Sequence, residues 1–201
     1  MACGPETPAP EHSDPAKAPP SIAEPDSANH PAGIEWVRKR YARITKMEEY
    51  GLVRCDSLAY TCDSEPINGL FTFCYIGEDL VRATHSRSIA DHSYTSEEYY
   101  LDIDDLYFVH LREGNWQFAQ PPGAKEGEVI SHTRDDVREE RVYYEEGNLI
   151  ERLFKDYQLL SWDDRGPEDF PNSRQGEPVR DVLGLEAVLA QRGKANYSCP
   201  E

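Results

Sequence analysis

The sequence contains no run of about 18 apolar residues, so no segment is expected to cross a bilayer as a helix. It has no G-x-S-x-G elbow, P-loop, G-x-G-x-x-G or H-E-x-x-H motif, so the common linear signatures of catalysis or nucleotide binding are missing. Basic residues are scarce: 21 Lys and Arg stand against 38 Asp and Glu, and the net charge is −17. Such a charge repels phosphate backbones and anionic lipid headgroups, so nucleic acid is not expected as a partner.

Aromatic residues supply much of the chain's apolar surface, with 12 Tyr, 6 Phe and 3 Trp among 201 residues. A chain of this length accommodates one domain of about 100–200 residues and a tail. The acidic excess is most simply explained by solubility, with binding to a basic partner protein as the alternative. We therefore expect a single α+β domain over residues 33–201.

Residues 1–32 differ in composition from the rest of the chain. They hold eight of the fifteen prolines, five acidic residues, one lysine and no aromatic residue. Such a mixture buries too little apolar area to offset the entropy of ordering the chain. Proline-rich segments of this kind extend by about 3.1 Å per residue. We expect residues 1–32 to form a disordered tether.

The first residues of this tether suggest an attachment point. Cys3 lies between Ala2 and Gly4, directly before the proline-rich stretch. This arrangement resembles the end of the lipobox of bacterial lipoproteins, although the apolar part of a leader is missing. The resemblance implies acylation of Cys3, contact with the membrane only through that lipid, and a periplasmic or outer-membrane-associated location in the bacterial cell envelope. The alternative is a cytosolic protein with an incidental cysteine.

Setting Cys3 aside leaves an even set of cysteines: Cys55, Cys62, Cys74 and Cys199. An oxidising envelope would allow them to form two disulfides, and four cysteines permit three pairings. Cys62 and Cys74 flank a turn-like segment, so a bridge across a hairpin is one option, while a bond to Cys199 would hold the C-terminus. The spacing does not favour zinc, because no C-x-x-C pair occurs.

Hydrophobic periodicity predicts the order of the elements. Apolar residues at three-to-four-residue spacing from Ile34 predict an amphipathic helix with a basic side that ends near Gly51. Aromatic strands of period two, each followed by an acidic or glycine turn and a second strand, predict hairpins of a curved antiparallel sheet. These hairpins, over residues 70–155, are similar in pattern to those of uncharacterised envelope lipoproteins. A C-terminal helix is predicted over residues 178–189, before Gly193.

Histidines and paired carboxylates are the candidates for chemistry. His85, His92 and His110 would form a metal site only if the sheet register brought them together, and isolated histidines on strands are more often hydrogen-bonded or surface residues. Adjacent carboxylates have the chemistry of a general acid and base, as in Glu97-Glu98, Glu139-Glu140 and Glu145-Glu146. Adjacency in so acidic a chain does not establish the separation that a glycosidase needs. No catalytic residue, metal or cofactor is therefore assigned.

Aromatic side chains are the binding feature that the sequence offers. Adjacent tyrosines on a strand point to opposite faces, so one of each pair can face solvent. The candidate ligand-binding residues are Tyr75, Tyr100, Trp116 and Tyr144. Such residues suit a glycan or a protein partner, and the alternative is that their rings fill the core.

Together these features predict a non-catalytic bacterial envelope lipoprotein that binds or scaffolds a ligand. One alternative is an acidic inhibitor or immunity-type protein that neutralises a basic partner with a steep salt dependence. A second alternative is a hydrolase, which would need a deep pocket that collects His85, His110 and several carboxylates.

Overall fold

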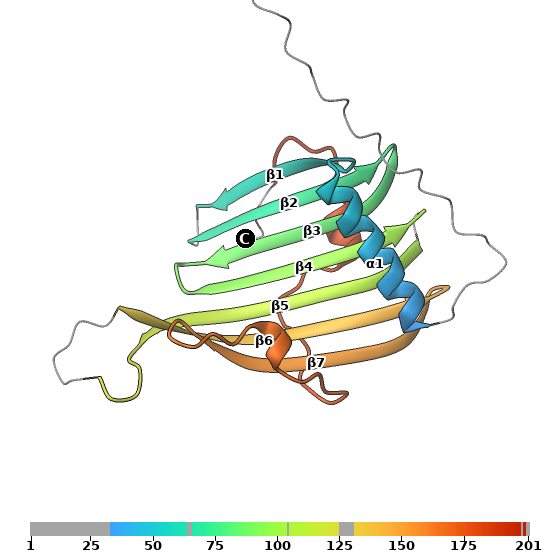
Figure 1. Cartoon of the computed structure of the whole chain (residues 1–201). Coiled ribbons are helices and arrows are strands. Elements are labelled where there is room, and N and C mark those ends of the chain that lie inside the picture. The colour runs from blue at the N-terminus through green and yellow to red at the C-terminus, as the bar shows by residue number, and fades with distance from the viewer. Residues whose placement is uncertain (1–32, 64–65, 104, 125–130, 198, 200–201) are drawn as a thin grey trace, which may run out of the picture.

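Seven strands in chain order form one open antiparallel sheet (Figure 1). The computed structural model describes residues 33–63, 66–103, 105–124, 131–197 and 199. The predicted tether and its Cys3 lie outside the described residues. The α+β class and the antiparallel meander that the sequence predicts are confirmed.

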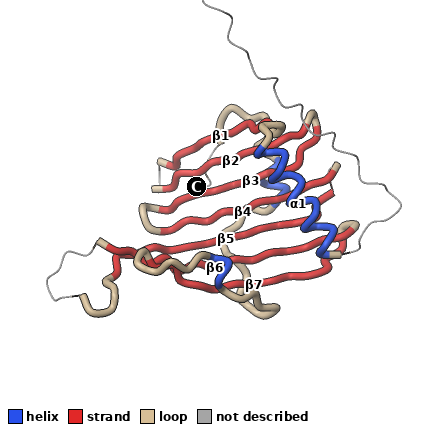
Figure 2. Tube along the Cα trace, in the orientation of Figure 1, coloured by secondary structure: helices blue, strands red, loops and turns tan. Residues whose placement is uncertain are grey.

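Each strand pairs with the one before and after it along the chain. The strands are β1 (Arg54–Cys62), β2 (Ile67–Ile76), β3 (Asp79–Ile89), β4 (Ser93–Asp102), β5 (Asp105–Ala119), β6 (His132–Glu145) and β7 (Asn148–Leu160). The helix α1 (Ile34–Glu49) precedes the sheet, and the 3-10 turn η1 (Pro167–Asp169) and the helix α2 (Leu185–Leu189) follow it (Figure 2). Within the described residues, no helix has the length and apolarity needed to cross a membrane.

Two of the predicted hairpin turns contain glycine in the left-handed region of backbone conformation. Gly77 connects β2 to β3 with φ 64°, and Gly147 connects β6 to β7 with φ 75°. Glycine adopts this conformation at little cost because it has no Cβ, so these positions stop one strand and start the next. The turn residues therefore determine where these two hairpins reverse.

The helix α1 covers one side of the sheet, called here the front face (Figure 1). Its buried side chains Val37, Ile44 and Met47 recur at the spacing expected for one side of a helix. Val37 and Ile44 pack against an aromatic layer contributed by β4, β5 and β6. The aromatic residues of that layer are Tyr100, Tyr107, Phe108 and Tyr143.

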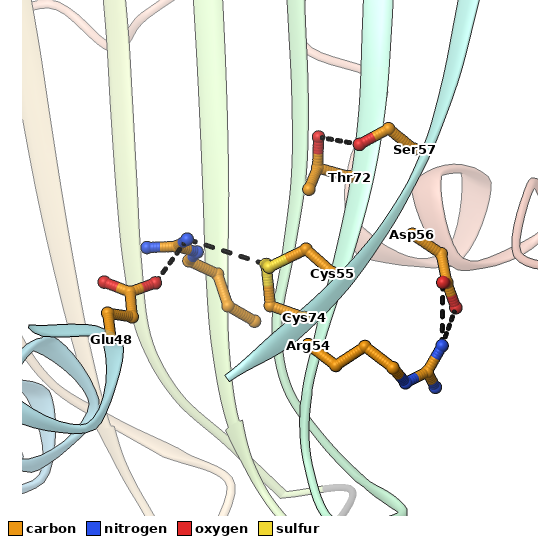
Figure 3. The surroundings of a disulfide bond; sticks show 8 residues. Glu48, Arg54, Cys55, Asp56, Ser57, Thr72 and Cys74 are labelled. Carbon is orange, nitrogen blue, oxygen red and sulfur yellow. Dashed lines mark hydrogen bonds and ion pairs between the residues drawn. A yellow bond between two sulfur atoms is a disulfide. The ribbon is translucent and has the colours of Figure 1, made fainter. Parts of the chain in front are cut away.

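Two ion pairs connect α1 to the sheet. Arg40 pairs with Asp102 at the end of β4. Glu48 Oε1 lies 2.6 Å from Arg82 Nη2, and the same nitrogen lies 3.6 Å from Cys74 Sγ. Figure 3 shows Glu48 of α1 beside the sheet, near Cys74. Arg40 of the basic side therefore pairs with an acidic residue of the sheet, whereas Glu48 pairs with a basic one.

The C-terminal segment covers the opposite side, called here the back face (Figure 1). Val179 and Val188 from this segment are buried against an apolar layer of the sheet. The strand residues of that layer are Phe71, Phe73, Tyr75, Leu80, Ala83, Tyr99, Leu101, Val109, Leu111 and Val142. Successive side chains along a strand point to opposite faces of the sheet. Because both faces are covered, neighbouring residues of one strand enter two different cores.

The predicted C-terminal helix is shorter than expected. The apolar pattern predicts a helix over residues 178–189, whereas α2 has five residues, Leu185–Leu189. Asp181 and Gly184 have φ values of 56° and 86°, which an α-helix does not allow. Residues 178–184 instead form a strap whose backbone N–H groups donate hydrogen bonds to carboxylates of the sheet. Those carboxylates compete with helix formation for the same donors.

Every cysteine in the described residues belongs to a disulfide. Cys55–Cys74 joins β1 to β2, and Cys62–Cys199 joins β1 to the C-terminal segment. The register of the first hairpin places Cys55 opposite Cys74 and Cys62 opposite Ile67, so the bridge between Cys62 and Cys74 is not formed. The prediction of two disulfides is confirmed, and one of them holds the C-terminus.

Candidate functional site

Two of the carboxylate pairs named in the sequence lie within β4 and β6, where the members of each pair point to opposite faces of the sheet. The third, Glu145-Glu146, lies at the turn between β6 and β7. Glu98 and Glu139 lie on the front face, with side-chain oxygens 3.8 Å and 3.3 Å from the ring nitrogens of His110. Glu97 and Glu140 lie on the back face, where they accept hydrogen bonds from the strap. Because strand side chains alternate, neither pair forms a neighbouring general acid and base.

Glu97 is the centre of a buried polar group on the back face, called the back-face cluster: Tyr60, His85, Glu97 and Tyr99. The Tyr60 hydroxyl lies 2.7 Å from His85 Nε2, and His85 Nδ1 lies 2.7 Å from Glu97 Oε1. Tyr99 donates its hydroxyl to Glu97 Oε2 at 2.6 Å. Two strap N–H groups, at residues 183 and 184, also donate to Glu97, each at 3.0 Å.

The order tyrosine, histidine, carboxylate is that of a relay that activates a hydroxyl nucleophile. Here, burial and the neighbouring Tyr197 together raise the pKa of Tyr60 to about 12, so the hydroxyl stays protonated at neutral pH. The Tyr197 ring also packs on the Tyr60 ring, with centroids 4.4 Å apart. Both oxygens of Glu97 are occupied by the strap. We interpret the back-face cluster as the anchor of the strap.

A second group of charged side chains, called the front-face cluster, lies on β5, β6 and β7: His110, Glu139, Arg141, Lys155 and Tyr157. Glu139, only 2% exposed, pairs with Arg141 and accepts a 3.3 Å hydrogen bond from the Tyr157 hydroxyl. Lys155 is 5% exposed, and its Nζ donates to the carbonyl of residue 167 in η1 at 2.7 Å. The cluster therefore connects the three strands to η1.

The charges of this cluster are arranged around Glu139. Burial by itself would raise the pKa of Glu139, but contact with His110 and the charges of Arg141 and Lys155 outweigh burial and lower the pKa to about 2. Burial and the nearby Arg141 lower the pKa of Lys155. The Glu139 carboxylate is therefore ionised throughout the physiological pH range and holds the cationic side chains in place.

A pocket of about 360 Å³ opens beside this cluster, between α1 and the loop that follows η1. It is called the α1 pocket, and its volume falls within the range of about 300–1,000 Å³ that is typical of small-molecule sites. Its lining residues are Val37, Arg38, Tyr41, Phe108, His110, Arg141, Tyr143 and Asn172. The lining thus combines aromatic rings with cationic groups and one carboxamide.

The structure does not bring together the four aromatic residues that the sequence proposes for ligand binding. Tyr75 and Tyr144 pack with the back-face core, and Tyr100 lies in the front-face core. Trp116 is half-buried near the end of β5, where its ring lies 4.4 Å from that of His92. The aromatic residues that line the α1 pocket are instead Tyr41, Phe108 and Tyr143.

The three histidines considered for a metal site are also separated. His85 belongs to the back-face cluster and His110 to the front-face cluster, while His92 follows β3 and contacts Trp116. Among the residues that the structure describes, no group of three or more His, Cys, Asp or Glu side chains is arranged to hold a metal ion. Of these histidines, His110 is the one that lines the α1 pocket.

Acid is expected to weaken the fold through Glu139. Its pKa is about 2 in the folded protein against an ordinary value of 4.5. A carboxyl with a lowered pKa stabilises the fold fully above its unfolded value, and this stabilisation is lost as the pH falls through the folded value. We expect a loss of about 3 kcal/mol from this group between pH 4.5 and 2.

The measurement is urea denaturation of the wild type and of Glu139→Gln over a pH series that covers this window. The variant should show lower stability at neutral pH and a shallower decline in acid, because it lacks the titrating group. Equal pH dependence in the two proteins would show that Glu139 titrates normally.

No protein-family model, no curated protein and no solved structure matches the chain. The α1 pocket is the candidate functional site because it lies beside a buried charged cluster and shares His110 and Arg141 with it. Sequence reasoning identified His110 but missed Arg38, Tyr41 and Arg141, which come from two distant elements.

Proposed function

We propose that the chain is a non-catalytic binding module of the bacterial cell envelope, attached to the membrane by a lipid on Cys3. The observation that carries this proposal is the pairing of the other four cysteines in two disulfides. Structural disulfides persist in oxidising compartments such as the periplasm. Because those four cysteines pair with one another, Cys3 is the odd cysteine of the sequence and is left for acylation.

Binding fits the α1 pocket and the front-face cluster beside it better than catalysis does. A general acid or base works best with a pKa near the working pH, and the pKa of Glu139 lies near 2. Arg141 is permanently charged and pairs with Glu139, so it is suited to hold a ligand rather than to transfer a proton. A rigid sheet with a preformed pocket meets the requirements of a binding module. A glycan component is one ligand of suitable size.

Mass spectrometry of the native protein tests the attachment and the compartment together. The expected result is a lipid-modified peptide containing Cys3 and no alkylation of the four other cysteines before reduction. After reduction, all four should alkylate. A bare Cys3 thiol together with four reduced cysteines would contradict the proposal.

Membrane fractionation provides a matched control. The Cys3→Ser variant, expressed with the native upstream sequence, should move from the membrane to the soluble fraction while its two disulfides still form. A variant that stays in the membrane fraction would show that Cys3 is not the attachment point.

A further inference from the structure

The lining of the α1 pocket is cationic, in contrast to the charge of the whole chain. The sequence carries a net charge of −17, yet the lining includes two guanidinium groups and an imidazole and no carboxylate. Arg38 comes from α1, and Arg141 and His110 come from neighbouring strands of the sheet. The three groups therefore approach the same volume from two different layers of the fold.

The carboxylates beside this lining are already engaged, among them Glu151, which lies opposite Tyr143 in the sheet and pairs with Arg174. Glu139 pairs with Arg141 and lies 3.3 Å from His110 Nε2. Glu98 accepts a 2.7 Å hydrogen bond from the Tyr100 hydroxyl. Arg38 is exposed and makes no ion pair within the described residues. An anion in the pocket would supply the carboxylate that Arg38 lacks.

The apolar part of the lining is aromatic. The rings of Tyr41 and Phe108 meet edge to face with centroids 5.8 Å apart, and Tyr41 is 42% exposed. The Tyr143 and Phe108 rings lie 5.1 Å apart and are buried, so Tyr41 is the ring that the pocket exposes. An exposed ring of this kind favours stacking with a flat ring or with the apolar side of a sugar. Asn172 adds both a hydrogen-bond donor and an acceptor at the edge.

We propose that the α1 pocket binds a small monoanion whose carboxylate is carried on a six-membered ring. The carboxylate would pair with Arg38 and with the free side of the Arg141 guanidinium, whose planar donors match carboxylate geometry. The ring would stack on the exposed ring of Tyr41. A monoanion is favoured over a doubly charged phosphate because Arg141 already shares its charge with Glu139. The inference rests on the proposed binding role and names its ligand class.

Two sources offer this chemistry, an aromatic acid and a uronic acid of a glycan, and the experiment separates them. The full chain is titrated by calorimetry with benzoate and with D-glucuronate, each against a neutral partner, benzamide and methyl glucopyranoside. We expect one acid to bind at least about tenfold more tightly than its neutral partner, since a charge-assisted pair is lost with the carboxylate. Whichever acid binds identifies the source.

Substitutions locate the binding. Arg38→Gln should weaken the bound acid at least about tenfold, while Arg43→Gln, an exposed change on the same helix but outside the lining, should not. Arg141→Gln should act in the same direction, but it also leaves Glu139 without its partner. Arg38 is therefore the decisive position, because substitutions at exposed positions of this kind have little effect on stability.

The outcomes distinguish this inference from the proposed function. Binding of neither acid overturns the ligand class. Equal binding of the neutral partners also overturns the anion inference, but it keeps the α1 pocket as a binding site. An effect of Arg43→Gln equal to that of Arg38→Gln would place the anion outside the pocket. None of these results depends on the lipid at Cys3, which mass spectrometry tests separately.

Discussion

Replacing Glu97 with alanine is expected to lower the free energy of unfolding by about 3–5 kcal/mol, because it breaks a buried charged network. The Glu97 side chain is fully buried and accepts four hydrogen bonds, from His85, Tyr99 and two strap N–H groups. These bonds lower the pKa of Glu97 against the opposing effect of burial. Its removal leaves the buried donors of His85 and Tyr99 and two half-buried strap N–H groups without an acceptor. Each buried unmet donor costs about 1–3 kcal/mol unless water enters.

Urea denaturation at neutral pH measures this loss. The matched control is Glu186→Ala, which removes an exposed carboxylate from α2 at the end of the same strap. Surface changes of this kind are usually within about 0.5 kcal/mol of the wild type. If Glu97→Ala fell within that range, the strap would be held without Glu97, by Glu140, apolar contacts and the disulfide.

The parts of the fold that the sequence predicts are those determined by neighbouring residues. The period of the apolar residues places α1, whose buried positions are Val37, Ile44 and Met47. Glycine turns place the reversals at Gly77 and Gly147. Each of these signals is complete within a few residues, so no knowledge of distant contacts is needed.

The strap could not be predicted in this way, because its conformation depends on carboxylates far away in the chain. Residues 178–184 have apolar spacing suited to a helix, but Glu97 lies 86 residues before Leu183 and still takes its N–H group. Glu140 takes the N–H of Val179 across 39 residues. Local propensity is overridden here by tertiary hydrogen bonds, which a periodicity argument does not contain.

The candidate site also depends on contacts between residues that are distant in the chain, but one local signal of it is present in the sequence. The segment from Arg138 to Arg141 places four charged residues in the middle of a strand, between Val137 and Val142. Buried charges must be paired, so this run indicates charged partners on both faces of the sheet. The partner residues Lys155 and Arg152 become evident only when β7 is placed beside β6. Sequence alone therefore suggests that a charged cluster exists but not that α1 closes a pocket over it.

Removal of the Cys62–Cys199 disulfide is expected to destabilise the protein more than removal of Cys55–Cys74. The two bonds close loops with sequence separations of 137 and 19 residues. The loop-entropy relation gives about 5 kcal/mol for the longer loop and about 3 kcal/mol for the shorter one.

The two double alanine variants, each retaining the other disulfide, are compared by urea denaturation with the same spectroscopic probe. The longer loop should have the larger effect because it also holds the strap and Tyr197 against the back face. The midpoint of the Cys62–Cys199 variant should therefore lie at the lower urea concentration. A lower midpoint for the Cys55–Cys74 variant would mean that the strap remains attached without its covalent bond, through Glu97 and the buried Val179 and Val188.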